Sequence, residues 1–241
     1  MTTIRHTARR GVRRVYEALG DHPLALPVLL AVTPESVSSR RVTPETDLVV
    51  EGFPRSGNTY AALGIALAQP RPLRIVSHAH VPAQVKRAVA LGVPTLVAVR
   101  EPADATCSMA VADPHHRVRD LLRYWIHYHQ QLLEVERGVL FASFEDITGG
   151  LGGVVDALNR RFGTELTPVA DDADTRERIF AAIEDKQRAV HGEARYHEAV
   201  PRPDPKRSDE GARRRAELEE TVDPAVLAQA RDLHRRLVDG P

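Results

Sequence analysis

The chain has 241 residues, 42% of them hydrophobic, which is enough for one α/β-sized domain with a substantial core. Basic and acidic residues number 33 each, so the formal net charge is zero and nothing global favours nucleic acid as a partner. The single cysteine, Cys107, excludes an internal disulfide and a cysteine-rich zinc site. It fits a reducing compartment, so we expect a cytoplasmic protein.

The first 46 residues contain no recognisable motif. Residues 1–20 have a basic amphipathic pattern, which we interpret as a solvated surface helix or a frayed end rather than a membrane-surface helix or a transit peptide. The apolar run 24–32 contains Pro27 and is far shorter than the roughly 20 residues that span a bilayer. We therefore expect no transmembrane helix and no signal peptide, and a loop over 33–46 that leads into the first strand.

Residues 47–60, DLVVEGFPRSGNTY, join a β-prone apolar run to a glycine-bounded turn, and a run with good helix propensity follows over 61–68. The turn has the glycine spacing and terminal threonine of a nucleotide phosphate loop, G-x-x-x-x-G-K-[ST], but Asn58 replaces the lysine. Such a loop binds phosphate through backbone N–H groups and a helix N-terminus, which do not need the lysine. The cation lies inside the turn instead, as Arg55.

This turn closely resembles the 5′-phosphosulfate loop of sulfotransferases, P-K-S-G-T-T-W. The chain follows that pattern position by position with three departures: Arg55 for lysine, Asn58 for the first threonine and Tyr60 for tryptophan. The resemblance implies that Arg55 acts on the group being transferred. It also implies that the donor 3′-phosphoadenosine 5′-phosphosulfate binds here without a metal, in contact with Arg55, Ser56, Gly57, Asn58, Thr59 and Tyr60.

A second predicted strand, 73–77, leads into Ser-His-Ala-His-Val-Pro. If the strand continues that far, His78 and His80 project from the same face, at the edge where open α/β sheets bind ligands. The segment also resembles the sulfotransferase stretch K-T-H-[LV]-P, with His80 on the histidine and His78 on the lysine. The resemblance implies that His80 is the catalytic base, with His78 as its rival or as a residue that orients sulfate.

A predicted helix over 83–92 and a strand over 94–99, buried on both faces, precede the segment REPADATCS. Pro102 suits the first turn of a helix, and Ser108 lies a turn after Asp104 on the same face. The segment matches R-x-P-x-D-x-x-x-S, the sulfotransferase 3′-phosphate motif, at every specified position. The resemblance implies that Arg100 and Ser108 bind the 3′-phosphate, and an arginine fork with a hydroxyl suits a phosphate monoester.

The position of Arg100 bears on the main alternative. A kinase with a phosphate loop holds Mg²⁺ partly through an aspartate at the end of a nearby apolar strand. Here the strand ends in Arg100, whose charge would repel a metal and attract a second phosphate group.

The second half of the chain is predicted to be mostly helical. Residues 118–136 should form one long helix, with His127 and His129 on its surface rather than bound to a metal. A fourth strand, 139–143, precedes FEDI, which is similar to the sulfotransferase sequence Y-E-D-[LM] and would place Phe144 near the adenine. The glycine-rich stretch 149–153 should be a turn before a helix over 154–162.

From residue 164 onward we expect polar helices. In sulfotransferases a C-terminal basic loop closes over the 3′-phosphate, and our candidates for it are Lys206 and Arg207, in the proline-broken stretch 195–209. Residues 210–238 should form one or two charged helices interrupted at Pro224, with acidic residues interleaved as on a solvated face rather than a nucleic-acid surface.

We therefore predict an α/β fold: one three-layer α/β/α domain over 1–241, with a central, mostly parallel sheet and a P-loop-like phosphosulfate-binding loop. The resemblance covers 47–163 and fades over 1–46 and 164–241. It implies a sulfotransferase acting on a hydroxyl or amine of a small molecule or carbohydrate. The alternatives are a Mg²⁺-dependent nucleotide or small-molecule kinase and a non-catalytic nucleotide-binding regulator. The sequence does not identify the acceptor, and it is compatible with a monomer or a homodimer.

Overall fold

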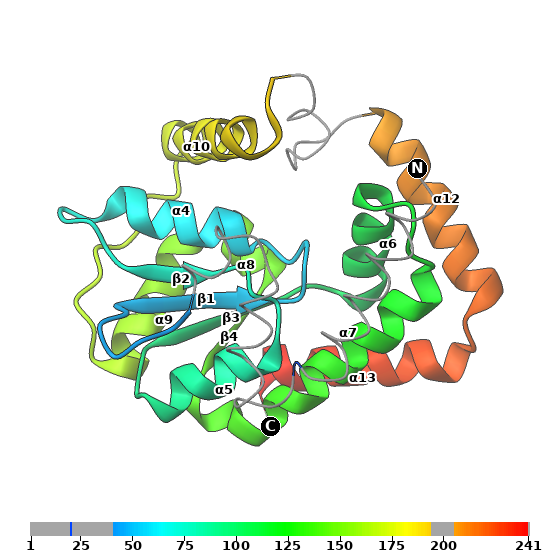
Figure 1. The fold of residues 1–241 in the computed structure, drawn as a ribbon, viewed down its shortest axis with the longest axis horizontal. Coiled ribbons are helices and arrows are strands. Elements are labelled where there is room, and N and C mark those ends of the chain that lie inside the picture. The colour runs from blue at the N-terminus through cyan, green and yellow to red at the C-terminus, as the bar shows by residue number, and fades with distance from the viewer. Residues whose placement is uncertain (1–19, 21–40, 194–204, 241) are drawn as a thin grey trace.

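A computed structural model of the protein describes residues 20, 41–193 and 205–240 (Figure 1). The predictions for residues 1–19 and 24–32 lie outside the described residues. Residues 41–46 form a loop, as predicted for the segment before the first strand. Among the described helices, none is both long and apolar enough to cross a membrane.

A four-stranded parallel sheet forms the centre of the molecule. Its strands follow the order β2 (Ile75–Ser77), β1 (Leu48–Gly52), β3 (Thr95–Val99) and β4 (Leu140–Ser143). The central strands β1 and β3 are buried along their whole length, which explains why they are near-continuous apolar runs in the sequence. Because all pairs are parallel, the carboxyl ends of the strands lie at one edge of the sheet, on the right in Figure 1.

Helices cover both faces of the sheet. One face packs against α4 (Asn58–Ala68), α8 (Phe144–Gly149) and α9 (Leu151–Phe162), and α10 (Ala173–His191) packs on α4. The other face packs against α5 (Pro82–Ala90), α7 (Val118–Leu132) and α13 (Pro224–Asp239). The predicted α/β fold is therefore confirmed, with every strand pair parallel.

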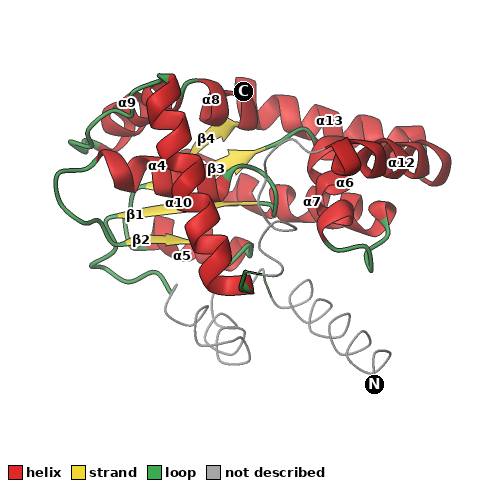
Figure 2. Cartoon of the chain, turned by 90° about the horizontal axis from the view of Figure 1, so that it is seen from above, coloured by secondary structure: helices red, strands yellow, loops and turns green. Residues whose placement is uncertain are grey.

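Two further helices lie beyond the carboxyl edge of the sheet. They are α6 (Pro102–Ala112), which follows β3, and α12 (Pro205–Thr221), which packs along α6. Figure 2 shows α6, α7, α12 and α13 gathered at this end of the molecule. The C-terminal helices are thus brought next to the loops that follow the strands.

Most predicted elements are confirmed, and the exceptions in the first 163 residues are the end of the long helix and the stretch 149–153. The α-helix that begins at Val118 ends at Leu132, and a 3-10 helix, η1 (Leu133–Gly138), replaces its predicted last turn. The stretch 149–153 is not an extended turn, because α8 begins directly after β4 and α9 already includes Gly152 and Gly153. Ser143 explains the early start of α8, since its hydroxyl accepts the Asp146 N–H at 2.9 Å.

The prediction that His129 lies on the surface is also wrong. Its side chain is fully buried, its ring centroid lies 3.9 Å from that of Trp125, and its Nδ1 donates to the Trp125 carbonyl at 2.8 Å. His129 belongs to the core between α7 and α13, and it is part of no predicted site.

Candidate functional site

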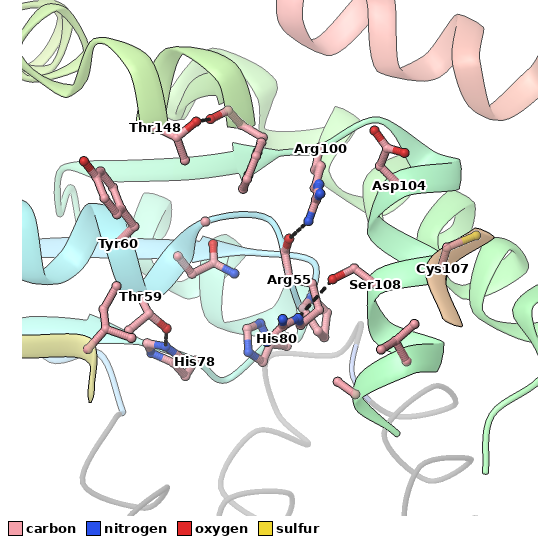
Figure 3. Close-up of a pocket in the computed structure, with 18 of the residues that line it drawn as sticks. Arg55, Thr59, Tyr60, His78, His80, Arg100, Asp104, Cys107, Ser108 and Thr148 are labelled. Carbon is pink, nitrogen blue, oxygen red and sulfur yellow. Dashed lines mark hydrogen bonds between the residues drawn. The ribbon is translucent and has the colours of Figure 1, made fainter. Parts of the chain in front are cut away.

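A cavity of about 1040 Å³ lies at the carboxyl edge of the sheet, bordered by the start of α4 and by α6, α8, α10 and α12 (Figure 3). This is the edge where open α/β sheets bind ligands. The cavity is lined by ten of the residues predicted from the sequence: Arg55, Gly57, Asn58, Thr59, Tyr60, His78, His80, Arg100, Ser108 and Phe144. Residues from four motifs, spread over positions 55–144, therefore meet in one place.

Two predicted residues stand apart from this set. Ser56 is fully buried and does not line the cavity, although its hydroxyl has no hydrogen-bond partner among the described residues. Arg207 lies in α12 rather than in a proline-broken loop, because the helix already begins at Pro205, and its side chain lies outside the described residues.

The turn between β1 and α4, residues 53–57, has left-handed backbone at Arg55 (φ 71°) and at Gly57 (φ 93°), which caps α4. Asn58 closes the turn, since its Nδ2 donates to the carbonyls of Gly52 and Phe53 at 3.4 and 3.1 Å. Its side chain is buried, and these bonds stabilise the turn at the position that is lysine in a nucleotide phosphate loop. The first N–H groups of α4 have no partners within the helix, and they carry the positive end of its dipole.

Gly52 is required by close packing at the end of β1. A Cβ atom at this position would lie 2.3 Å from the Ala98 carbonyl oxygen of β3 and 2.8 Å from Asn58 Oδ1. Only glycine allows β1, β3 and the braced turn to approach this closely.

Two arginines connect the turn to β3 and α6. Arg100 donates from a terminal nitrogen to the Arg55 carbonyl at 3.1 Å, and its guanidinium lies 4.2 Å from the centre of the Phe144 ring. Arg55 Nε donates to Ser108 Oγ at 3.2 Å. Figure 3 shows Arg55, Arg100 and Ser108 pointing toward one another across the cavity. The predicted companions of one phosphate group are therefore in contact with the arginine of the turn.

Arg100 is only partly satisfied in this arrangement. Its Nε is buried and has no hydrogen-bond partner within the described part of the chain. Burial lowers the pKa of the guanidinium, while the carboxylate of Asp104 is the main group that opposes the shift. A buried charged donor left unpaired costs about 1–3 kcal/mol or more, so an anionic ligand oxygen would be favourable here.

The two histidines line the cavity, but their backbone conformation was not predicted from the sequence. β2 ends at Ser77, as predicted, and both His78 (φ 70°) and His80 (φ 54°) have left-handed backbone, so the strand does not continue to place the two side chains on one face. The rings nevertheless lie together, with centroids 5.7 Å apart. Such backbone costs on the order of 1–3 kcal/mol per residue and persists where surrounding contacts hold it.

The hydrogen bonds of the two rings differ. His78 has both nitrogens engaged, by Ser77 Oγ at 2.5 Å and by Thr59 Oγ1 at 2.7 Å. His80 Nδ1 lies 2.8 Å from the carbonyl oxygen of Gly52. Because a carbonyl only accepts, Nδ1 carries the proton and the lone pair of the neutral ring lies on Nε2. Nε2 of His80 is therefore the nitrogen of that ring that can take a proton, and the bond of Nδ1 to the Gly52 carbonyl fixes this tautomer.

The structure adds a cavity residue that the sequence did not single out. Arg215 of α12 lines the cavity and pairs with the carboxylate of Asp104 on α6. It follows Arg213 and Arg214 in a charged helix, and no local pattern distinguishes it from them. Cys107 lies beside this pair, and burial raises the pKa of its thiol to about 11, so it stays protonated.

An apolar wall completes the cavity on the side of α4 and α10. The rings of Tyr60 and Phe180 meet edge to face with centroids 5.7 Å apart, and Ile183 lies on the same wall. Burial raises the pKa of Tyr60, so its hydroxyl stays protonated at neutral pH. The cavity thus combines a cationic side with an aromatic side, which suits a ligand that has both phosphate groups and a flat aromatic ring.

No protein-family model, curated protein or solved structure matches the chain. Evidence for a function therefore comes from the chemistry of the cavity.

Proposed function

We propose that the protein is a sulfotransferase that moves a sulfuryl group from 3′-phosphoadenosine 5′-phosphosulfate to a hydroxyl or amine of a small molecule or carbohydrate. The observation that carries the proposal is that two groups of residues suited to anions line one cavity. One is the start of α4 with Arg55, and the other is Arg100 with Ser108. The proposed donor has one anionic group at each of two positions of its ribose, so it can occupy both.

In this proposal the donor's 5′-phosphosulfate lies against the backbone N–H groups at the start of α4, and its 3′-phosphate lies near Arg100. Arg215 contributes charge on the same side, since it lies close enough to affect the pKa of Arg100. Phe144, Tyr60 and Phe180 supply the aromatic surface for the adenine.

The transfer step follows from the same placement. The acceptor oxygen or nitrogen attacks sulfur and a new bond to sulfur forms, while the bond between sulfur and the 5′-phosphate oxygen breaks. His80 takes the acceptor proton on Nε2, and 3′-phosphoadenosine 5′-phosphate leaves with the electron pair and the negative charge. By analogy with phosphoryl transfer, charge builds on the leaving oxygen, where the guanidinium of Arg55 stabilises the transition state more than the ground state.

One observation favours this proposal over a kinase. The end of β3, where a kinase would have a Mg²⁺-binding aspartate, has Arg100, whose guanidinium is bonded to the carbonyl of Arg55. This arrangement attracts a second anion at the position where a kinase needs a cation.

The cofactor test uses thermal unfolding. 3′-Phosphoadenosine 5′-phosphate should raise the melting temperature without added metal, and ADP should raise it much less, because ADP lacks the 3′-phosphate. Each charge-assisted contact contributes about 1.5–3 kcal/mol, so Arg100→Ala should erase most of the preference. Arg160→Ala, an exposed arginine on α9, serves as the control and should keep it. Equal stabilisation by ADP, or strict dependence on Mg²⁺, would favour the kinase.

Turnover then separates an enzyme from a regulator. Sulfur-labelled donor is incubated with a panel of sugars, lipids, phenols and amines, and the labelled product is measured. Transfer to one class of acceptor supports the proposal and identifies that class. Tight binding of the donor with no transfer to any class would favour the non-catalytic regulator.

A further inference from the structure

Glu51 is the one buried carboxylate among the residues that the structure describes. It lies in β1, one residue before Gly52, and its side chain is fully covered. It lies close to Tyr128 of α7, whose pKa is raised first by burial and then by the charge of Glu51. A carboxylate in such surroundings is tolerated only when its oxygens accept hydrogen bonds, so its partners indicate its role.

Its partners include two consecutive backbone N–H groups of the segment that carries the histidines. Ala79 donates to Glu51 Oε1 at 2.8 Å, and His80 donates to Glu51 Oε2 at 3.0 Å. Glu51 Oε2 also lies 4.0 Å from His80 Nδ1. The carboxylate therefore holds the chain on both sides of the peptide bond that leads into His80.

Two other contacts complete the support of His80. The Tyr124 hydroxyl donates to the His80 carbonyl at 2.8 Å, and the ring nitrogen Nδ1 donates to the Gly52 carbonyl at 2.8 Å. Glu51, Gly52 and the residues around them thus fix the backbone and the ring together. The left-handed backbone of His78 and His80 needs support of this kind to persist.

We propose that Glu51 is the positioning residue for His80: its carboxylate binds the N–H groups of Ala79 and His80 and so holds the left-handed backbone of His80, with Nε2 facing the acceptor. The inference rests on the proposed function for the identity of the reaction. The placement of His80 can be measured independently, from its ring tautomer. Glutamine is the discriminating replacement. Its side chain has the same shape but one acceptor oxygen, so its NH₂ group would face one of the two N–H donors.

The first measurement is kinetic. In Glu51→Gln, kcat at saturating donor and acceptor should fall on the order of tenfold to a hundredfold, because a small displacement of a catalytic group costs this much. The dissociation constant of 3′-phosphoadenosine 5′-phosphate should stay unchanged, since the turn before α4 and Arg100 are not altered. Asp223→Asn is the control, because Asp223 also accepts a hydrogen bond from a backbone N–H, of Ala225 at 2.8 Å, but supports the start of α13 and not the segment that carries His80.

The second measurement is the ring tautomer of His80, read from nitrogen-15 chemical shifts and assigned by the signals lost in His80→Asn. The wild type should have the proton on Nδ1, and Glu51→Gln should show a mixture of tautomers. A wild-type proton on Nε2, or an unchanged tautomer and kcat in Glu51→Gln, would overturn the positioning role. If the wild type transfers no sulfuryl group but the tautomer still shifts in Glu51→Gln, the proposed reaction fails and the positioning role stands.

Discussion

Three residues other than glycine have left-handed backbone in the described part of the chain, and all three line the cavity: Arg55, His78 and His80. Left-handed backbone at a residue other than glycine costs on the order of 1–3 kcal/mol. Glycine would avoid this cost, so these three side chains are expected to have a use. The strain is held by specific contacts, such as the bond from Arg100 to the Arg55 carbonyl. At the scale of single residues, strain therefore points to the same three side chains that the motifs indicate.

The two histidines can be distinguished by substitution. His80→Ala should lower kcat by roughly 10²–10⁴-fold, the usual contribution of a positioned base, because Nε2 of His80 carries the lone pair. His78→Ala should have a smaller effect on kcat, since both nitrogens of His78 are bonded to hydroxyl groups. The measurement is turnover of labelled donor, with donor affinity determined separately for each variant. Normal turnover in His80→Ala with loss in His78→Ala would move the base to His78.

At the scale of elements, the contact between α6 and α12 brings the C-terminal part of the described chain to the cavity. Arg215 of α12 pairs with Asp104 of α6, and Arg231 of α13 pairs with Glu101 directly before α6. These ion pairs are about half exposed, and such pairs stabilise a fold by at most about 1 kcal/mol. Arg215 lies close enough to Arg100 to affect its pKa. Binding of the donor is therefore a better explanation for Arg215 than stabilisation of the fold.

Arg215→Ala should therefore weaken binding of 3′-phosphoadenosine 5′-phosphate about tenfold or more, the loss expected for one charge-assisted contact, with little change in the melting temperature of the free protein. Isothermal titration measures the affinity. Arg213→Ala is the control on the same helix, because this side chain is 79% exposed. Equal losses in both variants would indicate a general effect of charge and would count against a contact by Arg215.

The elements themselves were largely predictable, because buried parallel strands are apolar runs and each motif marks the end of a strand. Contacts between segments that are distant in the sequence were not predictable. Glu51 is a single acid in an apolar strand, and nothing local shows that residues 79 and 80 will bond to it. Arg215 is one of three consecutive arginines, and only the packing of α12 on α6 selects it. The left-handed backbone of His78 and His80 likewise depends on these tertiary contacts.

At the scale of the whole molecule, the core between α7 and α13 contains polar groups that burial keeps neutral. His129 is fully buried, and burial lowers its pKa from 6.5 to about 3. The unfolded chain therefore binds one more proton than the folded chain between these two pH values. The contribution of His129 to stability is complete above pH 6.5 and is lost as the pH falls toward 3.

The free energy of unfolding should accordingly fall by up to about 1.4 kcal/mol per pH unit below pH 6.5 from this one group. Urea unfolding from pH 8 to pH 5 measures the slope. His129→Gln should reduce the slope, and His234→Gln should reduce it less, because burial lowers the pKa of the half-buried His234 as well but to a smaller extent. An unchanged slope in His129→Gln would show that this histidine can be protonated in the folded protein.

The placement of α12 also bears on when the cavity comes into existence during synthesis. A nascent chain that has reached residue 193 already contains the turn before α4, both histidines and Arg100. It still lacks Ser208, Gly211 and Arg215, which form one wall of the cavity, and Leu233 and Leu237, which fill the core beneath. A product of stalled translation or of proteolysis that ends before α12 would therefore carry the motifs without this wall of the cavity, and under the proposed function it should bind the donor more weakly than a chain that includes α12 and α13.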